Sequence, residues 1–145
     1  MHLVVKNFEQ LTKKELYEIL RLRMEVFIVE QGGRYQDLDQ IDYESIHIFF
    51  EEENEILGCL RMFLKPDEKE TMQLGRIVCK NRKAGMGRAL IEQATLLAKE
   101  QYHARELYLT GREDALDFYV KCGFHTASEK LGTAGHHYYL FRKSL

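Results

Sequence analysis

The segment from Gly75 to Leu97 joins an apolar strand, a basic glycine loop and an amphipathic helix without a gap. At its centre the chain reads Arg82-Lys-Ala-Gly85-Met-Gly87. The first amide groups of a helix have no partner within the helix, and the helix dipole adds partial positive charge there. A glycine loop between a strand and a helix is therefore typical of a backbone cradle for phosphate. This segment predicts a strand, a loop and a helix in succession, and a phosphate-bearing ligand.

Two common phosphate-binding motifs do not fit this loop. A P-loop requires Lys and then Ser or Thr after its last glycine, but Arg88 and Ala89 follow Gly87. A dinucleotide-binding fingerprint requires glycine or alanine where this chain has Leu90. It also requires an acidic residue at the end of the next strand, which residues 107–110 do not supply. The pattern that remains is Arg-x-x-Gly-x-Gly.

The size and composition of the chain predict one folded domain over residues 1–145. Of its 145 residues 45% are hydrophobic and one is proline, so a sizeable core can form without a linker. The formal net charge of −2 gives no general attraction toward nucleic acid or an anionic membrane. Positive charge gathers instead around the loop, at Lys80, Arg82, Lys83 and Arg88. This favours a small polyphosphate ligand, with a solvated helix start as the alternative.

The cysteine content and the length of the apolar runs indicate the cellular compartment of the protein. Cys59, Cys79 and Cys122 are odd in number and include no Cys-x-x-Cys pair, which argues against a disulfide framework or a zinc site. The first residues lack the apolar core of a signal peptide, and no apolar run reaches membrane-spanning length. We therefore expect a soluble cytoplasmic protein with no membrane segment and no metal.

Hydrophobic periodicity and capping signals predict an alternation of strands and helices. The order is strand-helix-strand-strand-strand-helix-strand-helix-strand-strand, which requires a mixed sheet with helices on both faces. Two Thr-x-x-Glu capping boxes, at 12–15 and 110–113, mark helix starts. Residues 34–44 are irregular and acidic. The predicted strands cover residues 2–8, 46–52, 56–64, 71–79, 106–110, 124–128 and 136–141, and the central helix covers 85–101.

This order, with a glycine loop after the fourth strand, resembles the GNAT N-acetyltransferases across nearly the whole chain. The run from Ala115 through Phe118-Tyr119 to Gly123-Phe124 is similar to the family segment Ala-x-x-Phe-Tyr-x-x-x-Gly-Phe. Residues 74–78, Leu-Gly-Arg-Ile-Val, resemble the strand that lies beside the pantetheine of the cofactor. Residues 22–31 and 35–39 are similar to the ElaA-like branch of the family.

The resemblance implies a GNAT fold, a mixed α/β (α+β) structure with a mostly antiparallel sheet, and an acyl-CoA-dependent N-acyltransferase. Acetyl-CoA would be the cosubstrate, and the acceptor a primary amine of a small molecule or a peptide. Transfer would be direct, without a covalent intermediate. The cofactor-binding residues carried over from the family are Ile77, Val78, Arg82, Lys83, Ala84, Gly85, Met86, Gly87, Arg88 and Tyr119.

The resemblance also assigns catalytic roles. The fourth strand of the family bulges, so that a backbone N–H near Ile77 or Val78 can hold the thioester oxygen. Tyr119 is the candidate general acid for the thiolate, with a core aromatic as the alternative reading. Glu30 and His47 are candidates for the general base, and for His47 a buried, hydrogen-bonded ring is the alternative.

Some alternatives stay open. Asp37, Asp39 and Asp42 could attract an ammonium substrate, or form a solvated acidic loop. The rival to an enzyme is an acyl-CoA sensor that keeps the pocket without the chemistry. A homodimer is compatible with the sequence, and the identity of the acceptor does not follow from it.

Overall fold

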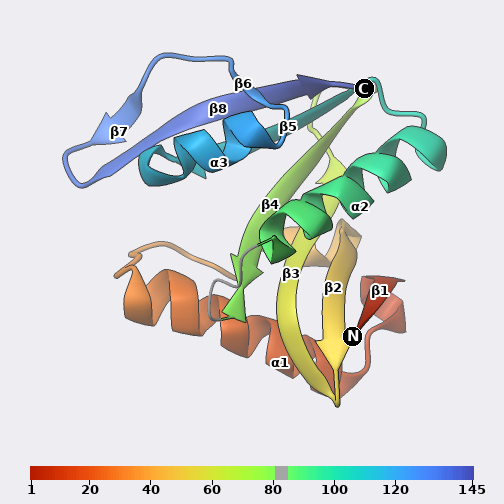
Figure 1. The fold of residues 1–145 in the computed structure, drawn as a ribbon. Helices are drawn as coiled ribbons and strands as arrows, with labels where there is room; N and C mark the ends of the chain where they lie inside the picture. Colours follow the sequence, from red (N-terminus) through yellow and green to blue (C-terminus); the bar gives the residue numbers. More distant parts are fainter. Residues whose placement is uncertain (81–84) are drawn as a thin grey trace. The chain divides into compact units, whose positions relative to one another are not determined.

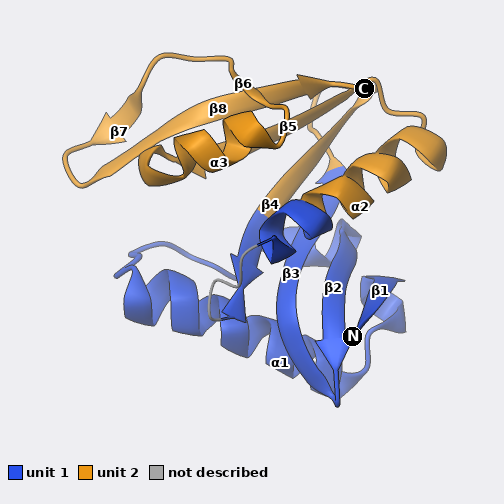
Figure 2. Ribbon diagram, viewed as in Figure 1, with its two compact units in different colours: residues 1–63, 76–90 blue, residues 64–75, 91–145 orange. Residues whose placement is uncertain are grey.

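The computed structural model describes residues 1–80 and 85–145, which form the helices and strands drawn in Figure 1. These residues divide into two compact units. Unit 1 comprises residues 1–63 and 76–90, and unit 2 comprises residues 64–75 and 91–145 (Figure 2). The single domain over residues 1–145 stays a prediction.

Hydrogen bonds join the strands in the order β1-β2-β3-β4-β5-β8-β6, with β7 paired to β8. The pairings of β1 with β2, β2 with β3, and β8 with β5, β6 and β7 are antiparallel, while β4 runs parallel to β5 over residues 71–73. The sheet is therefore mixed and mostly antiparallel, as predicted. The strands are β1 (His2–Asn7), β2 (Ile46–Glu52), β3 (Glu55–Leu64), β4 (Thr71–Cys79), β5 (Glu106–Arg112), β6 (His125–Thr126), β7 (Leu131–Thr133) and β8 (His136–Ser144).

The first helix begins where the sequence predicts and then changes its winding. The side chain of Thr12 accepts a bond from the Glu15 amide, and the Glu15 carboxylate accepts one from the Thr12 amide, so the capping box opens α1 (Lys13–Arg23). The chain then continues as a π-helix, η2 (Met24–Glu30), which the sequence did not predict. Further helical segments are η1 (Phe8–Gln10), η3 (Ile41–Glu44), α2 (Met86–Glu100), η5 (Glu113–Ala115) and α3 (Leu116–Lys121).

The second predicted capping box is wrong. Thr110 and the two residues after it extend β5, where they pair with residues 138–140 of β8. The backbone at Thr110 is therefore committed to the sheet. The helix α3 starts only after η5, from Ala115, whose side chain makes no capping bond. The strand β7 was also not predicted, and β6 is shorter than expected.

The core of unit 1 forms between one face of α1 and strands β2, β3 and β4. Its buried members are Ile19, Leu22, Phe49, Ile56, Cys59 and Val78, and Val4, Leu11, Val26 and Phe27 pack against them. Because residues of both η2 and β4 pack in this core, it fixes the positions of these two elements, which carry candidate site residues. None of the helices in the described residues combines the length and apolarity that a membrane span needs.

Candidate functional site

Strand β4 contains a residue in the left-handed backbone conformation. Arg76 has a φ of 52°, although it lies inside a strand and is not glycine. A left-handed residue within a strand is the geometry of one class of β-bulge. It lies immediately before Ile77 and Val78, where the resemblance implies a bulge. A non-glycine residue held this way costs on the order of 1–3 kcal/mol, so its surroundings must hold it.

The side chain of Arg76 is held by the loop of residues 34–44. Its Nη2 donates to the backbone oxygen of Asp37 at 3.1 Å and to Oδ2 of Asp39 at 3.2 Å. Its Nε lies 2.8 Å from Oδ1 of Asp37, an ion-pair contact whose angle does not make it a hydrogen bond. The guanidinium also lies 5.3 Å from the ring centre of Tyr35.

Two further arginines hold the same loop from other elements. Arg23 of α1 donates to Oδ2 of Asp37 at 2.9 Å and to Oδ1 of Asp42 at 2.8 Å. Arg61 of β3 donates to both oxygens of Asp39, at 2.8 and 2.7 Å, and to Asp42 at 3.2 Å. We call Arg23, Arg61, Arg76, Asp37, Asp39 and Asp42 the buried ion-pair cluster.

The carboxylates of this cluster are neither a solvated acidic loop nor free to attract an ammonium group. Asp37 and Asp42 are buried, and all three aspartates are paired with arginines. The hydrogen bonds from Arg61 lower the pKa of Asp39 to about 2. Burial alone would raise the pKa of Asp42, but the bonds and charges of Arg23 and Arg61 hold it below its ordinary value. The sequence-based interpretation of the solvated loop is therefore wrong for these residues.

His47 of β2 belongs to the surroundings of the cluster. It is buried, and its Nε2 lies 2.9 Å from the backbone oxygen of Asp42, so Nε2 carries the proton that is donated. Burial lowers the pKa of His47, which favours the neutral ring. This placement favours the buried, hydrogen-bonded histidine over a general base.

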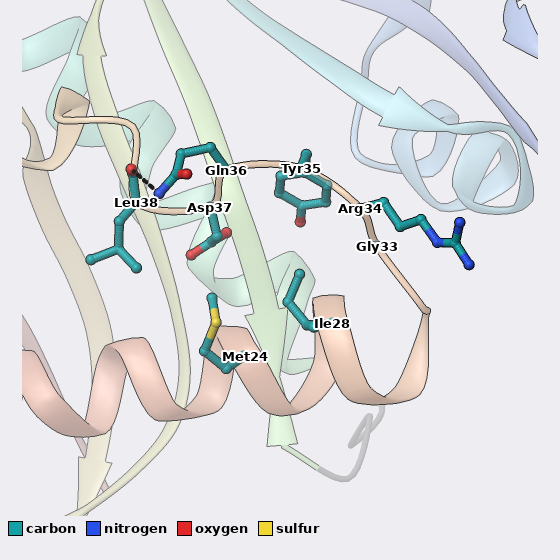
Figure 3. Close-up of a pocket in the computed structure, with 8 residues that line it drawn as sticks. All are labelled: Met24, Ile28, Gly33, Arg34, Tyr35, Gln36, Asp37 and Leu38. Carbon is teal, nitrogen blue, oxygen red and sulfur yellow. Dashed lines mark hydrogen bonds between the residues drawn. The ribbon is translucent and has the colours of Figure 1, made fainter.

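A hollow of about 590 Å³ adjoins the cluster within unit 1. The side chains of Met24 and Ile28 point from η2 toward the loop of residues 33–38, which forms the opposite wall of the hollow (Figure 3). The π-helical turn and the loop meet closely, because a Cβ on Gly33 would lie 2.7 Å from both the Phe27 oxygen and the Tyr35 ring. The lining residues are Met24, Ile28, Gly33, Arg34, Tyr35, Gln36, Asp37 and Leu38. Sequence analysis did not identify this hollow.

The first turn of α2 is partly exposed: Gly85 and Arg88 are exposed, whereas Met86 is buried. Gly85 has a φ of 89°, is exposed, and accepts the first helical bond from the Ala89 amide at 2.9 Å. A Cβ built on Gly85 would meet no atom within 4 Å. Met86 is buried and packs against Gly58, because a Cβ built on Gly58 would lie 3.0 Å from the Met86 sulfur. The start of α2 is therefore anchored by Met86.

The predicted phosphate-binding residues are placed only in part. Gly85, Met86, Gly87 and Arg88 are described, and Arg88 is exposed with its own interactions. The predicted residues Arg82, Lys83 and Ala84 lie outside the described residues. Open space above Gly85 fits the close approach of a phosphate group to a helix start.

Tyr119 lies on α3 in unit 2, within an aromatic group. Its ring centre lies 5.0 Å from that of Phe141, 5.2 Å from Phe118 and 6.2 Å from Phe124. Gly111 makes room for the ring, because a Cβ there would lie 2.5 Å from Tyr119 Cε2. The ring is thus half-buried and packed among other aromatic rings, and its role as an acid stays a prediction.

The candidate base Glu30 is exposed to solvent, and the thiols of Cys59 and Cys79 are unreactive near neutral pH. Glu30 is the last residue of η2 and is exposed. Burial raises the pKa of the Cys59 thiol to about 12 and that of Cys79 to about 11, so neither thiol ionises near neutral pH. Within residues 1–80 and 85–145, no group of three His, Cys, Asp or Glu residues is placed to hold a metal ion.

Comparison with known proteins gives matches that cover most of the chain. The sequence model of the Acetyltransferase (GNAT) family matches residues 13–124. A UPF0039 protein of Schizosaccharomyces pombe is 33% identical over 132 residues, covering 89% of this chain and 87% of that protein. Protein ElaA of Escherichia coli is 27% identical over 127 residues, covering 85% and 83% of the two chains.

Two solved structures are similar over the full length. An acyl-CoA N-acyltransferase from Pseudomonas aeruginosa is 27% identical with a TM-score of 0.89, covering 99% of this chain and 100% of that one. The crystal structure of Escherichia coli ElaA is 24% identical with a TM-score of 0.90, covering 99% of both chains. These two structures share the strand and helix arrangement of this chain.

Proposed function

Because the chain belongs to the Acetyltransferase (GNAT) family, we propose that it transfers an acetyl group from acetyl-CoA directly to a primary amine of a small molecule or peptide. The observation that carries this proposal is the left-handed Arg76 in β4, directly before the residues that would hold the thioester oxygen. The exposed, glycine-led start of α2 supports it, because it suits a pyrophosphate.

The first turn of α2 is the proposed site of the coenzyme A pyrophosphate. Met86 and Gly87 begin the first turn of α2, which is the positive end of the helix dipole and the end where backbone N–H groups point toward a bound anion, and Arg88 follows in the same turn. Gly85 leaves the approach open. Arg82, Lys83 and Ala84 are proposed contributors from the sequence pattern alone.

The backbone N–H of Ile77 or Val78 is the proposed donor to the thioester oxygen. Such a donor, aimed where negative charge develops, lowers the barrier by about 3 kcal/mol. The raised pKa values of the buried Cys59 thiol and the half-buried Cys79 thiol support direct transfer, since neither is available as a thiolate nucleophile.

Two side chains are proposed for proton transfer. Tyr119 would give a proton to the departing thiolate, because an ordinary phenol has a pKa near ~10 and is protonated at neutral pH. Glu30 remains the proposed base that takes a proton from the amine, directly or through water. His47 is not retained in this role, since its ring is buried and hydrogen-bonded.

The hollow in unit 1 is the proposed seat of the acceptor. Met24, Ile28 and Tyr35 give it apolar and aromatic walls. Asp37, the carboxylate in its lining, is paired with Arg23 and Arg76 and therefore offers little attraction to a polycation. We propose an amine with an apolar or aromatic substituent as the acceptor, in preference to a polyamine.

Release of free thiol from acetyl-CoA in the presence of pooled primary amines tests this function. Turnover that depends on an amine supports it. If acetyl-CoA raises the melting temperature while no amine of a broad panel releases thiol, the chain is an acyl-CoA sensor and the proposal fails.

Replacement of Tyr119 by Phe tests the proposed acid. We expect kcat to fall by about 10-fold or more, with the KM for acetyl-CoA nearly unchanged, because the acid acts on the leaving group. Tyr139→Phe is the matched control, since Tyr139 packs against Phe141 in the same aromatic group. Equal kcat for wild type and Tyr119→Phe across the pH range would remove the role.

A further inference from the structure

The left-handed residue of β4 is an arginine, although a glycine precedes it. Gly75 could adopt a positive φ at little cost, whereas Arg76 does so against the clash of its Cβ. A backbone irregularity that needed only conformational freedom would be served by the glycine. The side chain of Arg76 must therefore hold the conformation in place.

The contacts of Arg76 supply that hold. Its guanidinium meets the backbone oxygen and carboxylate of Asp37 and the carboxylate of Asp39, and the ring of Tyr35 covers it. Charged hydrogen bonds of this kind are about twice as strong as neutral ones. The partners all lie on one loop, so the guanidinium ties β4 to that loop.

The loop of residues 34–44 is itself held in place by two further arginines. Arg23 fixes Asp37 from α1, and Arg61 fixes Asp39 from β3 with two short bonds. Both arginines are buried, so loss of a partner would leave a charge without compensation. The hold on Arg76 is therefore rigid.

We propose that Asp37 and Asp39 are positioning residues that keep Arg76 left-handed and thereby fix the backbone N–H that receives the thioester oxygen. This rests on the proposed acyl transfer. Asp37 and Tyr35 also line the hollow, so the same loop that faces the acceptor holds the strand that faces the donor thioester.

The cluster contains a matched control for this role. Asp42 is buried and pairs with Arg23 and Arg61, as Asp39 pairs with Arg61 and Arg76. Both Asp39→Asn and Asp42→Asn remove one charge from the same cluster. The two variants differ in whether the partner of the left-handed residue is changed.

The first test compares the kinetics of these two variants. We expect Asp39→Asn to lower kcat by about 10-fold or more with the KM for acetyl-CoA within about twofold, because small displacements of a catalytic donor are costly. Asp42→Asn should lower the melting temperature while keeping kcat within about threefold of wild type. Equal losses of kcat in the two variants would overturn the proposal.

The second test separates the backbone from the side chain. Arg76→Gly should keep at least about 5-fold more of kcat than Arg76→Ala, since glycine accepts the left-handed conformation without strain. Asp39→Asn should have no further effect on kcat in the Arg76→Gly background, because its target is gone. Full additivity of the two substitutions would contradict a positioning role.

A structural readout distinguishes failure of this proposal from failure of the proposed function. Crystal structures of wild type, Arg76→Ala and Asp39→Asn give the φ of residue 76 whether or not acetyl transfer occurs. We expect a positive φ in the wild type and a negative φ in both variants. A positive φ retained in Asp39→Asn would refute the hold on Arg76 by Asp39, even if acetyl transfer is confirmed.

Discussion

Each unit of the molecule contains a cluster of ion pairs, and the two clusters differ in burial. In the buried ion-pair cluster of unit 1, Arg23 and Asp37 have side chains that are 1% and 2% exposed, and only its outer pair, Arg76 and Asp39, reaches 21% and 26%. In unit 2, Arg142 pairs with Glu68 and Glu106, and these side chains are 26%, 31% and 29% exposed. We call Arg142, Glu68, Glu106 and the neighbouring Lys65 the surface ion-pair cluster.

The difference shows what each cluster can do. A buried ion pair contributes little net free energy, because both charges lose their hydration. Removal of one partner is nevertheless strongly destabilising, because the other charge is left buried without compensation. Exposed pairs are screened by water and salt, so each is worth little. A buried cluster is therefore a device for fixing geometry, and unit 1 uses it on the loop that holds Arg76.

The largest effect is expected from Arg23. Arg23→Gln should lower the free energy of unfolding by about 3–5 kcal/mol, because Asp37 and Asp42 lose a shared buried partner. Urea unfolding measures it. Arg21→Gln is the control in the same helix, since Arg21 is exposed and its loss should cost within about 0.5 kcal/mol. Similar losses for the two variants would remove the contrast between buried and exposed charges.

Acid should weaken the buried cluster through Asp39. Its pKa of about 2 lies below the ~3.9 of an unfolded chain, so its contribution is complete above about pH 5 and declines as the pH falls toward 2. The difference in unfolding free energy between wild type and Asp39→Asn should therefore shrink from pH 7 to pH 3. A difference that is constant with pH would contradict the assignment.

The smallest effect is expected in the surface cluster. Glu68→Gln should shift the melting temperature by less than about 2 °C, because its pairs with Arg142 and Lys65 are partly exposed to solvent. The shift should shrink further at high salt. A loss as large as that of Arg23→Gln would show that burial does not separate the two clusters.

The family, the fold class, and the strand and helix on either side of the glycine loop could be predicted from the sequence because they depend on local signals. The capping box at Thr12 and the strand 71–79 are confirmed, and the sequence match to Protein ElaA supports the predicted branch of the family. The same Thr-x-x-Glu pattern failed at Thr110, where pairing with β8 overrides the local preference.

The residues that hold β4 could not be predicted, because their roles depend on partners far along the chain. Nothing local to residue 76 distinguishes a left-handed arginine from a regular one. The signal that existed was Arg61, which lies between Leu60 and Met62 in a strand buried on both faces. A charge in such a strand requires a buried partner, and the acidic residues 37–42 were the available source.

Binding of coenzyme A to Gly85→Glu, measured by calorimetry, tests the central claim that the start of α2 is the phosphate site. Gly135→Glu is a close control, because Gly85 and Gly135 have φ values of 89° and 85° and a Cβ on either meets no atom within 4 Å. We expect wild type and Gly135→Glu to bind equally, and Gly85→Glu to bind at least about 100-fold more weakly, a loss of about 2.7 kcal/mol. Unchanged binding by folded Gly85→Glu would contradict the account.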